Sequence, residues 1–301
     1  MKKAMLIINP SSGNEKAKTY RDLVKEKLES YFDEVEIKYT EKAGDAKKFA
    51  HKSAKERYDS VFVMGGDGTV NEGINGIAEQ EYIPNFGFFP LGTVNDLSRA
   101  LGIPLDPEKA IEELDFSLTR KIDIGKINNN YFMNVVAIGV IPEAVNEVDS
   151  EKKRVLGRLA YFVSGFKKFK NSKSYSFLMN TDGNAINTQS SLILVGLTNS
   201  IGGFEQILPK AKVDDGKLHM IYLKDYTMLD TVKTLPELIK GVEETSNSIG
   251  YVVFENGKIT VEDDVVLKTN VDGDEGEELP VELSVIPSHI NVYCGKKNNI
   301  K

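Results

Sequence analysis

Short apolar runs alternate with longer amphipathic stretches over the first third of the chain. Runs such as AMLIIN and SVFVMG suit strands that are covered on both faces, because both of their sides are apolar. In the stretches between such runs, apolar residues recur at the spacing of a helix. The pattern predicts strands at 4–9, 34–40, 60–65 and 86–92, and helices at 15–32, 45–58, 70–80 and 95–102. Strands that alternate with helices indicate a parallel sheet covered by helices, a three-layer α/β domain.

The rhythm changes near residue 120, where short β runs separated by Gly, Asn and Asp turns take over. They lie at 120–140, 175–200, 217–225, 251–263, 265–276 and 281–295, and are typical of an antiparallel sandwich or barrel. Two helical stretches, at 151–170 and 227–242, interrupt them. We therefore expect an α/β domain at 1–122 and an all-β domain at 123–287.

The composition argues against several kinds of partner and site. The formal net charge of −7 argues against nucleic acid as the partner, because non-specific binding to phosphates needs a basic surface. A single cysteine, Cys294, excludes an intramolecular disulfide and a cysteine-rich zinc site. The three histidines, His51, His219 and His289, lie far apart in the sequence, which disfavours a histidine metal site or a Ser-His triad.

The amino terminus, MKKAMLIINPSSG, has a basic start, but its apolar part covers only residues 4–8. That is shorter than the roughly 7–15 apolar residues of an export signal. No run approaches the roughly 20 apolar residues that span a bilayer. We expect a cytoplasmic protein with at most peripheral membrane contact.

The segment GGDGT follows the strand expected at 60–65. Glycines between a strand and a helix place free backbone N–H groups at the positive end of the helix, where phosphate binds. An acid among them suits nucleotide phosphates bound together with Mg²⁺. The segment is neither a P-loop nor a dinucleotide fingerprint, since Asn71 stands where the latter has its third glycine. The alternative is a tight left-handed turn in which Asp67 caps the helix.

A second turn of this kind, Gly92-Thr93, follows the strand expected at 86–92, and the NPSSGN turn follows the first strand. Ligands of parallel α/β sheets bind at the carboxyl ends of the strands. Three such turns at one edge therefore predict a nucleotide site. For Asp96, a helix N-cap is the alternative.

Together, the segments NPSSG, GGDGTVNE, PLGTVNDLSRALG, KIDIG, AKVDDGKL and NVDGDEGE resemble the diacylglycerol kinase catalytic family. The resemblance is to its bacterial soluble branch, which also includes relatives of sphingosine and ceramide kinases. It spans nearly the whole chain. It implies a nucleotide-binding domain like those of phosphofructokinases and NAD kinases, a β-sandwich domain, and a final segment of about 288–301 that returns to the first domain.

The resemblance also implies roles for individual residues. Nucleotide contacts would fall on Asn9, Thr40, Gly65, Gly66, Asp67, Gly68, Thr69, Asn71, Thr93 and Asp96. Catalytic Mg²⁺ would be held by Asp67, together with Asp96.

A structural Mg²⁺ would be bound by Asp215 and the backbone carbonyls of Lys212 and Lys217, with Asp123 linked to it through water. From the residues alone, the DDG segment suits a hairpin turn equally well.

The resemblance places the general base in VDGDEG. The family usually has Glu two residues after the first Asp, whereas this chain has Asp274. The shorter acid leaves three hypotheses: Asp274 is the base, Asp272 takes that role, or activity is reduced.

Residues 151–173 gather basic side chains within an acidic protein, and apolar residues recur among them at helical spacing. A basic amphipathic helix suits an anionic membrane surface. The alternative is an ordinary helix with a solvated charged face.

The prediction is an ATP-dependent lipid kinase that uses Mg²⁺ and transfers the γ-phosphate to a lipid hydroxyl, first of all converting diacylglycerol to phosphatidic acid. One alternative is a kinase for a soluble acceptor such as NAD. Another is a regulatory protein that binds nucleotide or lipid with little catalysis. A homodimer is a further hypothesis.

Overall fold

The computed structural model describes residues 1–13, 16–139, 174–224, 234, 237–238 and 240–295. The chain divides into two compact units, Met1–Ile124 with Pro287–Lys301, and Gly125–Ile286. These bounds lie next to the expected 1–122, 288–301 and 123–287. The predicted basic helix at 151–173 lies outside the described residues, as does most of the helix predicted at 227–242.

The first unit is built on parallel strands in the order β2-β1-β3-β4-β16. Its strands are β1 (Lys3–Ile8), β2 (Glu34–Tyr39), β3 (Ser60–Gly65), β4 (Asn85–Pro90), the start of β5 (Thr119–Ile127) and the end of β16 (Val281–Tyr293). Its helices are α1 (Lys16–Glu29), α2 (Asp45–Lys55), α3 (Asp67–Ile77), α4 (Asp96–Leu101) and α5 (Pro107–Glu113).

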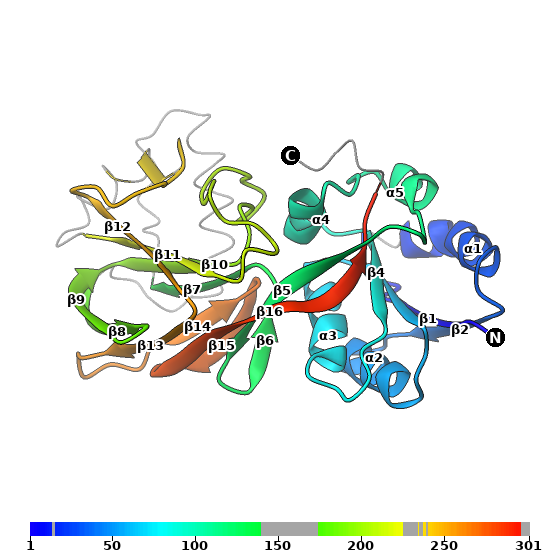
Figure 1. Ribbon diagram of the computed structural model, residues 1–301, viewed down its shortest axis with the longest axis horizontal. Coiled ribbons are helices and arrows are strands. Elements are labelled where there is room, and N and C mark those ends of the chain that lie inside the picture. The colour runs from blue at the N-terminus through cyan, green and yellow to red at the C-terminus, as the bar shows by residue number, and fades with distance from the viewer. Residues whose placement is uncertain (14–15, 140–173, 225–233, 235–236, 239, 296–301) are drawn as a thin grey trace. The chain divides into compact units, whose positions relative to one another are not determined.

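Helices cover both faces of this sheet, which confirms the three-layer α/β prediction (Figure 1). On one face, Val24 and Leu28 of α1 and Ile111 of α5 pack on alternate residues of the strands, including Leu6 and Phe62. On the other face lie α2 and α3.

Helix α3 lies so close to the sheet that a Cβ on Gly73 would be 2.8 Å from Val63 Cγ2. Helices α2 and α3 also pack closely at Gly76, because a Cβ there would lie 2.4 Å from the backbone carbonyl oxygen of Lys47 in α2.

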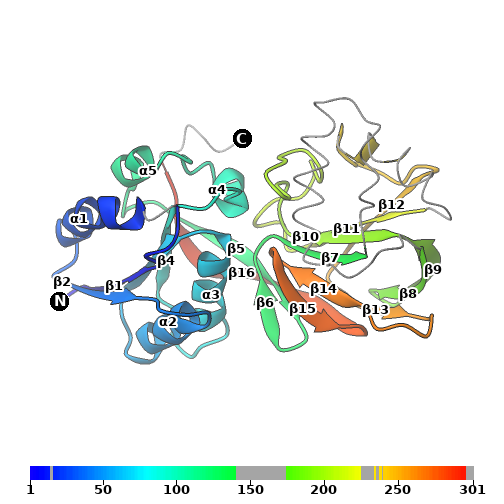
Figure 2. The same cartoon turned by 180° about the vertical axis from the view of Figure 1, so that it is seen from behind.

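The second unit is a sandwich of antiparallel strands, as predicted (Figures 1 and 2). One sheet has the order β12-β11-β10-β7-β14-β15, and the facing strands are β5, β16, β13, β8 and β9. The remaining bounds are β6 (Asn130–Phe132), β7 (Val135–Gly139), β8 (Tyr175–Thr181), β9 (Asn184–Ser190), β10 (Leu192–Gly196), β11 (Leu218–Leu223), β12 (Ile249–Phe254), β13 (Asn256–Val261), β14 (Lys268–Val271) and β15 (Asp274–Glu278).

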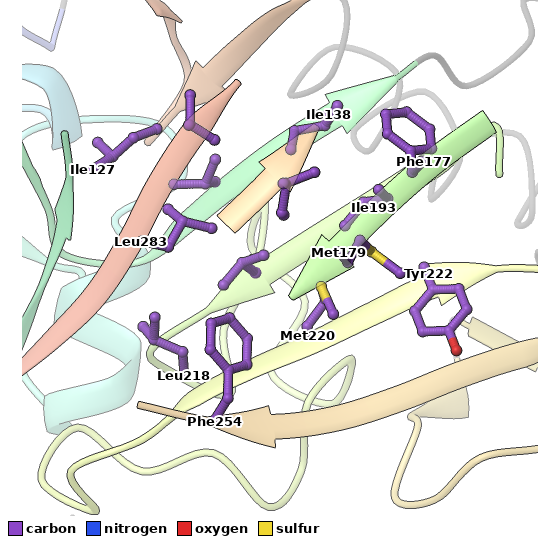
Figure 3. Packing of buried hydrophobic residues seen from close by; sticks show 14 of the residues in the cluster. Ile127, Ile138, Phe177, Met179, Ile193, Leu218, Met220, Tyr222, Phe254 and Leu283 are labelled. Atoms are coloured by element: carbon purple, nitrogen blue, oxygen red, sulfur yellow. The ribbon is translucent and has the colours of Figure 1, made fainter. Parts of the chain in front are cut away.

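The core of the sandwich is formed by alternate residues of facing strands, such as Met179, Ile193 and Leu283, with the aromatic rings of Phe177 and Phe254 (Figure 3). Each of these five residues is at most 2% exposed. Alternation of buried and exposed residues is what one covered face of a strand requires, and β8 shows it residue by residue.

Several helix bounds differ from the prediction. Helix α3 begins at Asp67 instead of residue 70, because Gly68 and Thr69 take helical conformation directly after the strand. Helix α5 was not predicted, although Asp106 caps it by accepting a hydrogen bond from Lys109 N and Pro107 occupies its first turn. Among the described residues, no helix is long and apolar enough to cross a bilayer.

His289 predicts a pH dependence of stability. Its Nε2 accepts a hydrogen bond from the backbone N–H of Glu79 at 2.9 Å. Burial lowers the pKa of His289 below its ordinary value of 6.5, although Glu79 opposes this shift. The folded state therefore binds this proton less readily than the unfolded chain, and His289 lowers stability as the pH falls from about 6.5 through its folded-state pKa.

We expect the free energy of unfolding to fall more between pH 7 and pH 5 in the wild type than in His289→Gln, whose amide oxygen can still accept the Glu79 N–H. Urea unfolding at each pH measures this, with exposed His51→Gln as the matched control. Equal pH slopes for the wild type and His289→Gln would contradict the assignment.

Candidate functional site

The GGDGT segment forms the end of β3 and the first turn of α3. Gly66 is the N-cap, in extended conformation with φ −89° and ψ −177°. None of Gly65, Gly66 and Gly68 has a positive φ, so the alternative of a left-handed turn capped by Asp67 is wrong. The first N–H groups of this 11-residue helix lack partners within the helix, which gives its start the partial positive charge that phosphate needs.

Glycine is required in these turns because the two turns touch. A Cβ on Gly92 would lie 2.9 Å from Gly66 Cα and 2.7 Å from Asn95 Oδ1. A Cβ on Gly65 would lie 2.6 Å from Cβ of Thr69. The structure therefore brings together the two glycine turns that the sequence separates by about 25 residues.

The Asp67 carboxylate ties these turns to each other. Its Oδ2 accepts a hydrogen bond from Asn95 N at 2.8 Å, and its Oδ1 accepts one from Asp96 N at 3.0 Å. Asn95 is the N-cap of α4, with φ 53°, and its side chain exchanges two hydrogen bonds with the backbone of Gly92. The alternative that Asp96 is the N-cap is therefore wrong, since Asp96 is the first helical residue and is 2% exposed.

Asp67, which is half-buried, and Asp96, which is buried, form an acidic pair. Burial raises the pKa of Asp67 above its ordinary value, the charge of Asp96 raises it further, and the backbone N–H bonds act in the opposite direction. A cation beside both carboxylates would relieve this unfavourable burial of like charge. Mg²⁺ at nucleotide sites commonly takes one or two carboxylates together with phosphate oxygens, so this pair fits the ion. No group of three or more His, Cys, Asp or Glu side chains suited to a metal occurs in the described part of the chain.

The other predicted nucleotide residues lie just beyond the carboxyl ends of neighbouring strands. Asn9 follows β1, and its Nδ2 donates to Thr69 Oγ1 at 3.0 Å. Thr40 follows β2, and its N–H donates to the carbonyl of Ile8. Thr93 is exposed in the turn after β4.

Asn71 lies within α3, where its Oδ1 accepts a hydrogen bond from Asn75. This amide oxygen is therefore occupied inside the helix.

In the second unit, Asp272 and Asp274 differ sharply. Asp272 is 5% exposed, and its carboxylate accepts three backbone hydrogen bonds of 2.7–2.9 Å from Met133, Asn134 and Val135. Asp274 is exposed at the start of β15. The neighbouring Glu275 pairs with Lys268 at 2.6 Å. Of the two predicted bases, the geometry favours Asp274, because Asp272 fastens the turn to the segment before β7.

Asp215 closes its own turn. Its carboxylate accepts hydrogen bonds from the N–H groups of Lys212 at 3.0 Å and Lys217 at 2.9 Å, the arrangement of the hairpin alternative. Its Oδ2 also lies 2.9 Å from His219 Nε2, and His219 Nδ1 lies 2.6 Å from the Tyr251 hydroxyl. Both oxygens of Asp215 are thus bonded within this unit, and a Mg²⁺ ion there stays a prediction.

His219 was not among the predicted site residues, although a polar residue inside the apolar run LHMIYL indicates a buried, hydrogen-bonded side chain. Asp123 belongs to the first unit, where its Oδ1 accepts the N–H of Ser288 at 2.7 Å. Its link through water to Asp215, a residue of the second unit, stays a prediction.

Comparisons with known proteins agree with this arrangement. Residues 3–127 match the model of the diacylglycerol kinase catalytic domain, and residues 134–294 match the YegS C-terminal NAD kinase beta sandwich-like domain. A Streptococcus pneumoniae serotype 4 protein with a lipid-kinase name is 42% identical over 99% of this chain and 100% of its own length. A Staphylococcus aureus diacylglycerol kinase is 37% identical over 97% of this chain and 92% of its own.

The chain belongs to the diacylglycerol kinase family of lipid kinases. A Bacillus anthracis crystal structure of a protein assigned to the diacylglycerol kinases superposes with a TM-score of 0.82, at 29% identity and over 98% of this chain and 97% of that one. The α/β unit and the β-sandwich unit are thus those of the family.

The contact between the glycine turns can be tested by Gly92→Ala. The added Cβ would meet Asn95 Oδ1 and the backbone of Gly66 below van der Waals distance, so the turn must shift. We expect a loss of about 1–3 kcal/mol in unfolding free energy. Gly295→Ala is the control, because its Cβ would meet nothing closer than 3.7 Å. Equal stability of the two variants would show that the turns are not packed as described.

The different roles of Asp272 and Asp274 predict that substitution of Asp272 lowers stability and substitution of Asp274 leaves it unchanged. An asparagine at 272 presents an NH₂ group to at least one of three backbone N–H donors, so we expect Asp272→Asn to cost about 1–3 kcal/mol. Asp274→Asn should leave the urea unfolding midpoint within experimental error. If Asp272→Asn is as stable as the wild type, Asp272 does not fasten this turn.

Proposed function

We propose that this protein transfers the γ-phosphate of ATP to the free hydroxyl of diacylglycerol and so produces phosphatidic acid. The observation that carries the proposal is the joining of two glycine turns by Asp67, which sets the acidic pair of Asp67 and Asp96 beside the amino terminus of α3. The S. aureus relative named diacylglycerol kinase supports the choice of acceptor.

In this proposal, the N–H groups at the start of α3 bind nucleotide phosphate oxygens. Thr69 Oγ1 already accepts the hydrogen bond from Asn9, so its own proton is available for a phosphate oxygen. Mg²⁺ would be held by Asp67 and Asp96 and would neutralise phosphate charge when bound. Thr40 and Thr93 would add contacts to the nucleotide.

Asp274 serves as the general base. The acceptor hydroxyl oxygen attacks the γ-phosphorus, the hydroxyl proton passes to the Asp274 carboxylate, and the bond to the β–γ bridging oxygen breaks to release ADP. An exposed carboxylate can reach a lipid hydroxyl, whereas the carboxylate of Asp272 is committed to backbone N–H groups.

The test is transfer of labelled γ-phosphate from ATP with Mg²⁺ to lipids in mixed micelles, and to NAD as a soluble acceptor. Label in diacylglycerol that Asp67→Ala abolishes supports the proposal. Label in another lipid alone changes the acceptor, and label in NAD alone overturns the lipid assignment. ATP binding without transfer to any acceptor favours the regulatory alternative.

Removal of the base should lower the rate of transfer while nucleotide binding persists. We expect Asp274→Asn to reduce kcat by about 100-fold or more, the usual scale of general base catalysis. Asp274→Glu, which restores the longer acid of the family, should retain or raise activity. An unchanged kcat in Asp274→Asn would exclude Asp274 as the base.

A further inference from the structure

Glu72, the last residue of the GGDGTVNE segment, bonds to a different part of the chain from the glycines. It lies in the second turn of α3 and is half-buried. Its Oε1 accepts a hydrogen bond from the backbone N–H of Gly44 at 2.8 Å, and its Oε2 accepts one from Ala46 at 3.1 Å. Both carboxylate oxygens therefore bind the start of α2.

This contact supplies a cap that α2 does not have locally. Gly44 is the N-cap of α2, with φ 86°, and glycine carries no side chain that could accept an N–H. The first N–H groups of a helix have no partner within the helix, and a carboxylate near them is favoured by the helix dipole. A residue of α3 thus caps α2 from the neighbouring helix.

The loop before α2 is held at both ends. Thr40 N donates to Ile8 O of β1 at 2.9 Å, which fixes the start of the loop. Asp45 Oδ2 accepts hydrogen bonds from the N–H groups of Glu41 and Lys42. Glu72 fixes the end of the loop against α3, where the two helices also meet at Gly76.

We propose that Glu72 is a positioning residue for nucleotide binding, which holds the loop after Thr40 at a set distance from the first turn of α3. The inference rests on the proposed function, because Thr40 and the α3 turn are the two parts of the nucleotide site that Glu72 connects. Glu72 acts through the backbone of residues 44–46 and does not itself contact the nucleotide.

The test compares Glu72→Gln with Glu26→Gln, which removes an exposed carboxylate on α1. Glutamine keeps one oxygen that can accept a hydrogen bond, but its NH₂ group faces the other backbone N–H, which then loses its acceptor. We expect the Kd of an ATP analogue to rise about tenfold in Glu72→Gln, on the scale of one hydrogen bond to a charged group. The KM for lipid and the kcat at saturating ATP should stay within about twofold.

Two further measurements separate positioning from general stability. Amide hydrogen exchange of Gly44 and Ala46 should accelerate in Glu72→Gln while exchange in the strands is unchanged. In a double-mutant cycle, Thr40→Val and Glu72→Gln should weaken nucleotide binding less than additively, because both act on one loop.

Faster exchange at Gly44 and Ala46 with an unchanged nucleotide Kd would overturn the inference, as would additive effects in the cycle. Failure of the proposed nucleotide site looks different, because the wild type itself would then not bind the analogue. Failure of the transfer to lipid alone would leave analogue binding by the wild type intact, and the comparison with Glu72→Gln would still hold. If Glu72→Gln does not fold, Glu72→Asp, which can reach one of the two N–H groups, gives the same comparison.

Discussion

The hydrogen bonds from Asn95 and Asp96 to the Asp67 carboxylate are the constraint on which the candidate site depends. They add to the pairing of β3 with β4 and to the close approach of Gly66 and Gly92, which already bring the two glycine turns together. With them, the start of α3, the Gly92 turn and the acid pair form one arrangement. The raised pKa of Asp67 shows that this arrangement carries an electrostatic cost in the absence of a cation. The Mg²⁺ proposed above would offset this cost.

The second unit uses a carboxylate in a similar way. Asp272 accepts three consecutive backbone N–H groups and so sets the turn from which Asp274 extends. In both units an acid therefore fixes the backbone. In the second unit the proposed base is a neighbouring exposed acid, Asp274, whereas in the first unit Asp67 is also proposed to bind Mg²⁺.

Much of the fold could be predicted because the spacing of apolar residues and the turn-forming residues determine secondary structure over short stretches of sequence. The strand at 60–65 and the change from α/β to β structure near residue 120 follow from such patterns. The true start of α3 could not be predicted, since Gly68 and Thr69 are poor helix formers and the close approach of Gly66 to Gly92 joins residues far apart in the sequence. The roles of Asp272 and Glu72 depend on partners at least 26 residues away, and His219 bonds to Tyr251, 32 residues away, so local spacing does not reveal them.

The last strand has a consequence for how the chain is made. β16 pairs with β13 through residues 281–284 and with β4 through Val292. Tyr293 then stacks on Phe62 at 5.3 Å and bonds to Ser60. During synthesis, the sheet of the first unit therefore has an open edge at β4 until β16 has left the ribosome. The first unit, although its other strands are made earlier, can be completed only after the strands of the second unit that precede β16 have been made.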